Sequence, residues 1–499
     1  MIAALMAVLA LAVPRAGDGQ LTELQGKLGG SDVRARRAAV QELAKLGSLE
    51  AWKLVIGVLG DMNAQVADEA QLQIAKIADP KVRALLLGKD GAEAKDPWVR
   101  VRVAEALAHS SGELPLGSVS TLLRDKETSV RRTFAWTLER LQRAGALQDA
   151  LGADRSALAV VRAAVAAVAA KEKDAETRAA QLVAHGVLGG PLTLAAADEL
   201  LGDKEPAVRA AAALLAQDAP PEIALHVVRG LALDKHVGAR IASAELAARV
   251  ASKPAARALV DALERESEPV ARWRDLDLLR ALSGQKMGLN PKAWRAWVDG
   301  LAEDWTGTLT TPEELPDAER SVAFVGLPIR SGRVVFLVDL SGSVWEKRAD
   351  GKTKKQRIDV ELARALRALP EGTEFNLIPY TSKPIPWEKG LVRADKTSVE
   401  KALAFFDGRK DSGTGNFWDA LELALEDPRV DNVIVLTDGA PTGGRRWNLG
   451  LMRELFVERN RFRRVVLDAI LADAPRALTK EWLEMCASSG GRVVEVDWR

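Results

Sequence analysis

The chain has 499 residues, of which 47% are hydrophobic and 28% charged, and its formal net charge is +1. This length exceeds what one hydrophobic core supports, so we expect two or more domains. The balanced charge excludes a global attraction to nucleic acid or to a membrane surface, and the single cysteine, Cys486, excludes a disulfide framework or a multi-cysteine metal cluster.

The chain begins with an apolar run from Met1 to Val13, which is followed by Pro14 and Arg15. The run has the length of the hydrophobic region of a secretory signal peptide and is too short to span a membrane as a helix. We therefore expect a signal peptide over residues 1–18, a periplasmic or secreted protein, and no further transmembrane span. Because no Lys or Arg precedes the run, the alternative is an apolar N-terminal helix.

Residues 20–285 repeat one helical pattern, in which short turns end in an apolar residue followed by arginine. A spacing of 31 residues recurs in two sets of these arginines: Arg100, Arg131 and Arg162, then Arg178, Arg209 and Arg240. Apolar residues at helical spacing follow the turns, so one face of each helix is expected to be buried. A repeat unit of about 31 residues cannot bury its own apolar face, so neighbouring units must stack into an α-solenoid. The pattern resembles HEAT repeats; an irregular helical bundle is the alternative.

Residues 286–325 differ from the repeats in composition. Asn290 and Pro291 are typical of the N-cap and the first turn of a helix, and this helix would place Trp294 and Trp297 against the end of the solenoid. The segment after it is rich in Gly, Thr and Pro, which predicts a linker.

From residue 326 to residue 499, apolar runs alternate with amphipathic stretches. This alternation predicts βα units and a mostly parallel sheet, that is, an α/β doubly wound, Rossmann-like domain after the solenoid. We predict strands at 333–338, 373–380, 432–437, 464–470 and 492–496. We predict helices at 358–369, 398–406, 416–425, 448–459 and 478–488. A further strand at 387–391 could form a hairpin at the edge of the sheet.

Oxygen-bearing side chains gather at the ends of these predicted segments. They are Asp339, Ser341 and Ser343 after the first strand, Thr414 before a helix, and Asp438 after the strand at 432–437. The carboxyl ends of parallel strands share one edge of a sheet, where open α/β folds bind ligands. Carboxylate and hydroxyl oxygens suit Mg²⁺. For either aspartate alone, the alternative is a turn cap.

Three segments, Asp-Leu-Ser-Gly-Ser at 339–343, Gly-Thr-Gly-Asn at 413–416 and Thr-Asp-Gly at 437–439, resemble in their order the motifs of a von Willebrand factor A (vWA) domain with a metal ion-dependent adhesion site. The resemblance implies a vWA domain over residues 326–499. It also implies Mg²⁺, with Mn²⁺ or Ca²⁺ as substitutes, bound by Asp339, Ser341, Ser343, Thr414 and Asp438. In such a site the metal is a bridge to an Asp or Glu of a protein partner rather than a catalyst.

Thr414 departs from the family pattern. The family places its threonine four residues before the Asp that opens the next helix, whereas Thr414 precedes Asp419 by five and Gly415 occupies the usual place. Either the loop holds an extra residue and Thr414 still binds the metal, or water replaces its hydroxyl. We favour Thr414 as the ligand.

Aromatic and basic residues follow the motifs. Trp345, Trp418 and Trp447 either surround the metal or pack beneath the loops. The loop over residues 347–357 is basic, which would steer an acidic partner or merely form a solvated loop.

No sequence pattern predicts catalysis. All four histidines lie in the helical half, and there is no Gly-x-Ser-x-Gly, Gly-Lys-Ser/Thr or His-Glu-x-x-His motif. We therefore expect a non-enzymatic adhesion protein, similar to bacterial proteins that join HEAT repeats to an A domain, with a solenoid that a second protein could contact and no nucleic acid partner.

Two other functions stay open. Similar A domains occur as partners of AAA-type motors, so the chain could be an intracellular accessory subunit of a separate ATPase. An enzyme with acidic groups in the solenoid groove is the third hypothesis, although no pair of acids stands out. By the same family resemblance, the helix at 478–488 would move when the metal gains a ligand.

Overall fold

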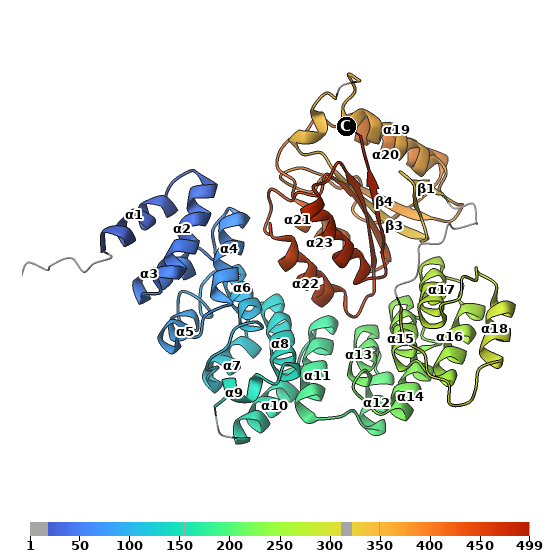
Figure 1. Cartoon of the computed structure of the whole chain (residues 1–499), viewed down its shortest axis with the longest axis horizontal. Helices are drawn as coiled ribbons and strands as arrows, with labels where there is room; N and C mark the ends of the chain where they lie inside the picture. The colour runs from blue at the N-terminus through green and yellow to red at the C-terminus, as the bar shows by residue number, and fades with distance from the viewer. Residues whose placement is uncertain (1–17, 153–154, 311–321, 349, 499) are drawn as a thin grey trace, which may run out of the picture. The chain divides into compact units, whose positions relative to one another are not determined.

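The computed structural model describes residues 18–152, 155–310, 322–348 and 350–498, so most of the expected signal peptide lies outside the described residues. The chain divides into two compact units, Met1–Gly112 and Glu113–Arg499. The first unit is helical, and the second holds further helices and an α/β domain (Figure 1).

The helices of the first unit are α1 (Asp18–Leu28), α2 (Val33–Leu46), α3 (Leu49–Gly57), α4 (Ala64–Ile74), α5 (Pro80–Leu86) and α6 (Pro97–Leu107). Aspartate caps three of them: Asp32 accepts from the backbone N–H of Arg34 (2.8 Å), and Asp79 and Asp96 cap α5 and α6 in the same way. These caps satisfy amide groups that the first turn of a helix leaves unpaired.

The helices of the second unit before the α/β domain are α7 (Leu116–Leu123), α8 (Thr128–Arg143), α9 (Leu147–Ala150), α10 (Arg155–Ala169), α11 (Ala175–Gly189), α12 (Leu194–Leu201), α13 (Pro206–Ala216), α14 (Pro221–Leu231), α15 (Val237–Val250), α16 (Lys253–Arg265), α17 (Pro269–Ser283) and α18 (Pro291–Asp299). Helices α8, α11, α13, α15 and α17 pack in one row, and α12, α14, α16 and α18 pack in a second row beside it. This stacking confirms the predicted helical repeats.

The periodic arginines close each turn and join it to the next repeat. Arg209 donates from Nη1 to the carbonyl oxygens of Asp203 (2.9 Å) and Lys204 (3.0 Å) in its own turn. Its Nε and Nη2 pair with the carboxylate of Asp234, which belongs to the following turn. The same link is made by Arg178 to Asp203 and by Arg240 to Glu266. We call these three pairs the arginine ladder.

Helix α18 begins at Pro291 and is capped by Asn290, as predicted. Trp294 is fully buried, and α18 packs on α16. The Trp294 ring meets that of Trp297 edge to face at 5.7 Å between centroids, and Trp297 meets Trp305 in the same way at 5.7 Å. This aromatic group covers the end of the helical rows.

The α/β domain contains a six-stranded sheet in the order β5-β4-β3-β6-β7-β8 and a two-stranded sheet of β1 and β2. The strands are β1 (Ala323–Phe324), β2 (Leu327–Pro328), β3 (Arg333–Asp339), β4 (Glu374–Tyr380), β5 (Val392–Arg393), β6 (Asn432–Thr437), β7 (Val466–Ala472) and β8 (Val493–Val496). All pairings in the large sheet are parallel except that of β5 with β4. All five predicted strands are present, with ends within two residues of the prediction.

The edge strand was predicted too early in the chain. The antiparallel strand is Val392–Arg393 rather than 387–391. The Asn376 side chain donates to the carbonyl oxygen of Glu388 (2.8 Å) and accepts from its N–H (3.2 Å). The Trp387 N–H still donates to the Leu377 carbonyl oxygen of β4 (2.8 Å), but the Asn376 side chain takes both backbone groups of Glu388, so the regular strand begins only at Val392.

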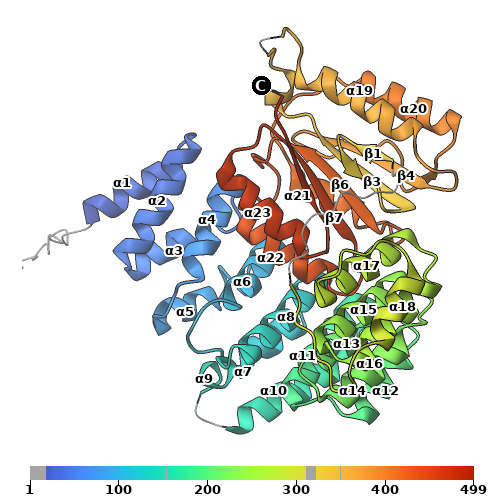
Figure 2. The ribbon, with the colours of Figure 1, turned by 45° about the vertical axis from the view of Figure 1, so that its right-hand side comes forward.

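Helices cover both faces of the sheet (Figure 2). They are α19 (Lys354–Arg367) and α20 (Lys396–Asp407) on one face, and α21 (Phe417–Ala424), α22 (Leu449–Asn460) and α23 (Arg476–Ala487) on the other. Alternate residues of β3 enter the two cores: Val335 and Leu337 pack with α21 to α23, whereas Val334, Phe336 and Val338 pack with α19 and α20. A strand buried on both faces explains the continuous apolar run in the sequence.

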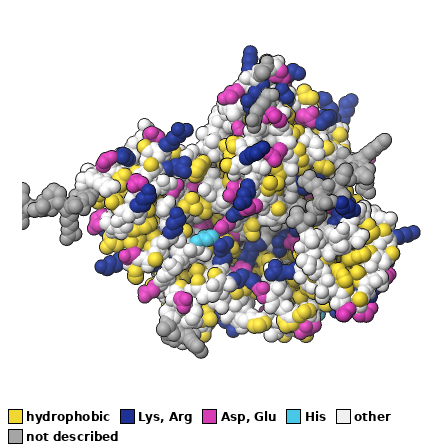
Figure 3. Space-filling model, viewed as in Figure 1, with side chains coloured by type: hydrophobic (Ala, Val, Ile, Leu, Met, Phe, Trp, Pro, Cys, Tyr) yellow, Lys and Arg dark blue, Asp and Glu magenta, His cyan; other side chains and the backbone are white. Residues whose placement is uncertain are grey.

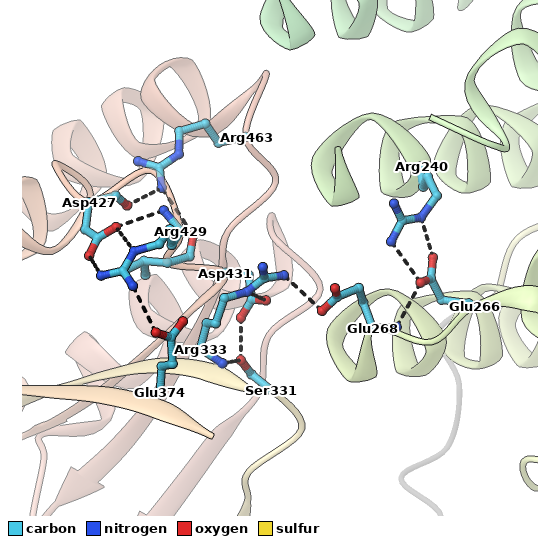
Figure 4. Close-up of polar contacts among 11 residues, drawn as sticks. Arg240, Glu266, Glu268, Ser331, Arg333, Glu374, Asp427, Arg429, Asp431 and Arg463 are labelled. Carbon is cyan, nitrogen blue, oxygen red and sulfur yellow. Dashed lines mark hydrogen bonds and ion pairs between the residues drawn. The ribbon is translucent and has the colours of Figure 1, made fainter. Parts of the chain in front are cut away.

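Within the second unit, the repeats contact the amino-terminal edge of the large sheet. Arg333, the first residue of β3, pairs with Glu268 before α17 (2.9 Å) and with Asp431 before β6 (3.0 Å), as Figure 4 shows. In the segment between α22 and β7, Arg461 pairs with Glu139 of α8 at 2.6 Å. These contacts leave the carboxyl edge of the sheet at the opposite end of the strands.

Charge is mixed on the surface. On the face drawn in Figure 3, acidic and basic side chains are interspersed over the helices and over the α/β domain. Within the described ranges, no helix is both long and apolar enough to cross a membrane.

Candidate metal centre

The candidate site lies where β3 and β6 end side by side. From β3 the chain continues to β4 and β5 on one side of the sheet, whereas β6, β7 and β8 lie on the other side of β3. Such a switch in strand order opens a crevice at the carboxyl edge of a sheet. Asp339, the last residue of β3, is 1% exposed. Its carboxylate accepts from the N–H of Ser341 (2.8 Å) and from the hydroxyl of Thr437 (2.9 Å) at the end of β6.

Four of the five predicted ligands lie together at this edge. The Ser341 and Ser343 hydroxyl oxygens are 3.4 Å apart. The Ser343 hydroxyl donates to the carboxylate of Asp438, which follows β6 directly. Since Ser341 also bonds Asp339, the two serines and the two aspartates form one group of oxygens.

The fifth predicted ligand, Thr414, lies on the neighbouring loop and bonds a residue outside this group. That loop is held against the first one by a hydrogen bond from the N–H of Gly342 to the carbonyl oxygen of Gly413 (3.2 Å). The Thr414 hydroxyl donates to the hydroxyl of Ser382 (3.2 Å), and the Thr414 side chain lies against Gly443. The structure thus places the Thr414 oxygen beside Ser382.

The site carries negative charge without a basic partner. Burial, together with the nearby charge of Asp438, raises the pKa of Asp339 to about 6 against the lowering effect of the hydrogen bonds from Ser341 and Thr437. Tyr380, which faces Asp339 across the β3–β4 register, has its pKa raised by burial and then by the charge of Asp339. In the part of the chain that the structure describes, neither aspartate forms an ion pair.

These residues fit a hard divalent cation. The described residues contain no group of three or more His, Cys, Asp or Glu side chains that could hold a metal, so a site here depends on two carboxylates and neutral hydroxyls. Two carboxylates balance the charge of Mg²⁺, and oxygen donors are the ligands it prefers. A cation would also relieve the uncompensated charge of the buried Asp339.

Comparison with known proteins assigns the domain. Residues 332–454 match the family model of the von Willebrand factor type A domain. The chain carries a vWA domain. Over 130 residues it is 32% identical to inter alpha-trypsin inhibitor heavy chain 4 of Mus musculus, and over 131 residues it is 32% identical to inter-alpha-trypsin inhibitor heavy chain H4 of Homo sapiens. Each alignment covers 24% of this chain and 13% of the relative.

A solved von Willebrand factor type A structure from Catenulispora acidiphila is also similar, with 19% identity and a TM-score of 0.27. The alignment covers 33% of this chain and 38% of that chain. The family match over residues 332–454 agrees with the predicted vWA domain, and the packed helical rows agree with the predicted repeats before it.

The sequence did not point to two threonines that belong to this part of the vWA domain. Thr437 stood inside the Thr-Asp-Gly motif, and its hydroxyl orients Asp339. Thr442, three residues beyond Gly439, accepts from the N–H of Gly415 at 2.8 Å. Its contact joins two loops that are distant in the sequence, and no local pattern signals it.

The aromatic and basic residues near the motifs have mainly structural contacts. Trp418 is buried in the core of the vWA domain, and Trp345 is half-buried with its ring N–H donating to the carbonyl oxygen of Leu340 (3.2 Å). Lys354 and Lys355 are buried rather than solvated, and they pair with Asp473 (3.2 Å) and Asp359 (2.5 Å). Both lysines are thus committed to ion pairs inside the domain.

Proposed function

We propose that this protein is a non-enzymatic interaction protein whose vWA domain binds an acidic side chain of a protein partner through Mg²⁺. The observation that carries the proposal is the group of Asp339, Ser341, Ser343 and Asp438, which combines two carboxylates and two hydroxyls with no ion pair to either acid among the described residues. Thr414 is not needed for this part of the proposal.

The chemistry follows from the donor set. Asp339 and Asp438 balance the charge of a divalent cation, whereas the serine hydroxyls add oxygens without adding charge. When bound, the cation supplies an electrophilic position that a carboxylate of the partner can occupy. Asp339 stays oriented by the Ser341 amide and the Thr437 hydroxyl, while Ser343 and Asp438 are only half-buried and are open to a partner.

A binding role agrees with the residues around the site. All four histidines lie before residue 240, so the vWA domain has no imidazole to act as an acid or base. The helical repeats contact the amino-terminal edge of the sheet through Glu268 and Glu139. We propose that they serve as a scaffold, which leaves the carboxyl edge with the proposed metal site open to a partner.

We also propose that the protein works in the periplasm or outside the cell. The apolar run from Met1 to Val13 supports this localisation. Sequencing the N-terminus of the protein purified from its host tests it: a mature end near residue 18 is expected, and an intact Met1 would contradict export.

Calorimetric titration with Mg²⁺ tests the metal site. We expect heat from one site in the wild-type chain and none in Asp339→Ala. Asp304→Asn is the matched control, because Asp304 is exposed in the segment that follows α18, outside the vWA domain, and loses the same charge. Absence of heat in the wild type, or equal heat in Asp339→Ala, would reject the metal site.

Partner recognition needs a separate test. Proteins captured from a host extract by immobilised protein in Mg²⁺ should be released by EDTA, and immobilised Asp339→Ala should capture none of them. Replacing each Asp and Glu of a captured partner in turn should identify one acid that is essential. Binding that survives both EDTA and every such replacement would contradict recognition through the metal.

A further inference from the structure

The vWA domain lacks a side chain at the position where its family places a threonine, and that position is Gly415. A Cβ built on Gly415 would lie 3.4 Å from Oδ2 of Asp339. A side chain at 415 would therefore point at the metal-site carboxylate, whereas glycine leaves that space to another residue.

The Thr414 side chain has its own partners on two neighbouring loops. Its N–H and its hydroxyl both bond the hydroxyl of Ser382, each at 3.2 Å. On its other side the Thr414 side chain meets Gly443, where an added Cβ would collide with the Thr414 hydroxyl. Thr414 thus fixes the position of its loop, and its oxygen is bonded to Ser382.

Thr442 is placed beside the same space from the loop that follows β6. Its Oγ1 lies 3.6 Å from the Cβ position of Gly415, so the side-chain oxygens of Thr442 and Asp339 lie near one point, together with the carbonyl oxygen of Ala440 at 3.4 Å. The backbone holds this arrangement in register: the Gly415 N–H donates to the Thr442 hydroxyl (2.8 Å), and the Thr442 N–H donates back to the Gly415 carbonyl oxygen (3.1 Å).

The hydroxyl of Thr442 retains the capacity to bind a cation. A threonine oxygen has two acceptor lone pairs, and the Gly415 N–H uses one of them. Thr442 is exposed, so its second lone pair is accessible, and Ser343 and Asp438 are only half-buried.

The geometry points to Thr442 as the third hydroxyl of the metal site, in the place that Thr414 was expected to fill. The inference rests on the proposed metal site. It means that one loop, from Asp438 to Thr442, supplies both a carboxylate and a hydroxyl, while the loop at 413–416 contributes only backbone.

Two isosteric variants separate the candidates. Titration calorimetry with Mg²⁺ is carried out on the full chain as wild type, Thr442→Val, Thr414→Val and Thr442→Ser. We expect the dissociation constant for Mg²⁺ to rise about tenfold in Thr442→Val, as is typical when a metal site loses one supporting oxygen. Thr414→Val and Thr442→Ser should bind Mg²⁺ as the wild type does.

Thermal unfolding in EDTA shows whether each variant folds, so a loss of binding is assigned to the hydroxyl only when the unfolding temperature is unchanged. Wild-type affinity in Thr442→Val would overturn the inference and leave the proposed function intact. A loss in Thr414→Val, or equal losses in Thr414→Val and Thr442→Val, would overturn it too. If the wild type binds no Mg²⁺, the proposed function and this inference both fail.

Discussion

At the scale of single residues, the carboxylate of Asp339 is buried in the vWA domain without an opposite charge. Asp339 is 1% exposed, faces the charge of Asp438 and has no basic partner within the described residues. Burying a charge in this way costs free energy unless an opposite charge compensates it. A cation bound at the proposed site would therefore remove a cost that the cation-free domain carries.

The substitution Asp339→Asn should reveal this cost. In EDTA we expect it to unfold at a temperature equal to or above that of the wild type, because the amide keeps the bond from Ser341 without the charge. With Mg²⁺ at 100 times its dissociation constant, the wild type should gain about 2.7 kcal/mol and the variant nothing. Scanning calorimetry in both buffers measures the difference, and equal stabilisation of the two proteins by Mg²⁺ would contradict the arrangement.

Residues of the site differ in how well the sequence predicts them. Asp339, Ser341 and Ser343 follow directly on an apolar strand, so a local pattern places them at the sheet edge. Thr442 could not be predicted in this way, because its contact with Gly415 spans 27 residues and depends on how two loops pair. The sequence shows that position 415 is a glycine, but only the fold shows which residue lies beside the space that a side chain there would occupy.

At the scale of elements, the repeats owe their regular spacing to the arginine ladder. Arg209 and Arg240 donate to carbonyl oxygens of their own turns and to an acid of the next, so the turn and the joint between repeats share one side chain. The 31-residue period was predictable from the arginines. The acids 25 residues after Arg178 and Arg209 were equally visible in the sequence, but their partners became evident only when the packing of successive turns was known.

Arg209→Ala tests the ladder. The Arg209 and Asp234 side chains are 10% and 5% exposed, so removing the arginine leaves a buried acid unpaired and should cost about 3 kcal/mol locally. Native-state hydrogen exchange in α13 and α15 measures this loss. Arg229→Ala, which removes an exposed arginine from the last turn of α14, should leave exchange there unchanged. Equal effects of the two variants would reject a special role for the ladder.

Helix α23 is tied to the loop that carries Asp438. The buried ring N–H of Trp482 donates to the carbonyl oxygen of Gly439 at 3.0 Å. Gly439 has a φ of +89°, and a Cβ there would come within 3.0 Å of Ala474, so the loop and the start of the helix fit closely. If metal binding shifts Asp438, we therefore expect the shift to reach α23, the helix that the family resemblance expects to move.

Hydrogen exchange of α23 with and without Mg²⁺ should show this coupling. We expect Mg²⁺ to change the protection of α23 in the wild type and to change it less in Trp482→Phe, which keeps the ring but loses the donor. Asp339→Ala, which should bind no Mg²⁺, is the control for effects of Mg²⁺ that do not involve the site. An Mg²⁺ response of α23 that is unchanged in Trp482→Phe would show that this hydrogen bond does not couple the two.

At the scale of the whole molecule, the second unit joins its helical rows to its sheet mainly by ion pairs. Arg464 pairs with Glu245 of α15 (3.0 Å), in addition to the pairs of Arg333 and Arg461 described above. A small apolar cluster that includes Ile241 and Val270, with Val466 of β7 packed against it, accompanies them. The sequence predicted both parts but not this joint, because its partners are single residues far apart in the chain.

Gly238→Ala should loosen the joint. Gly238, the second residue of α15, lies so close to the carbonyl oxygen of Arg463 that an added Cβ would collide with it. We expect faster hydrogen exchange over the segment before β7. Gly117→Ala is the matched control, because Gly117 is the second residue of α7 and has nothing within 4 Å of its Cβ position. Unchanged exchange in Gly238→Ala would show that the joint adapts to the methyl group.

Strand β3 connects two attachment points. Its first residue, Arg333, pairs with Glu268 of the helical part, and its last residue, Asp339, belongs to the proposed metal site. If a partner attached at that edge were pulled while the repeats stayed anchored, tension would run lengthwise along the strand. Ladder hydrogen bonds lie across the strands, so such a load would be shared in shear by the bonds to β4 and β6 rather than breaking them one after another. The mounting of the domain therefore suits an attachment that must bear force.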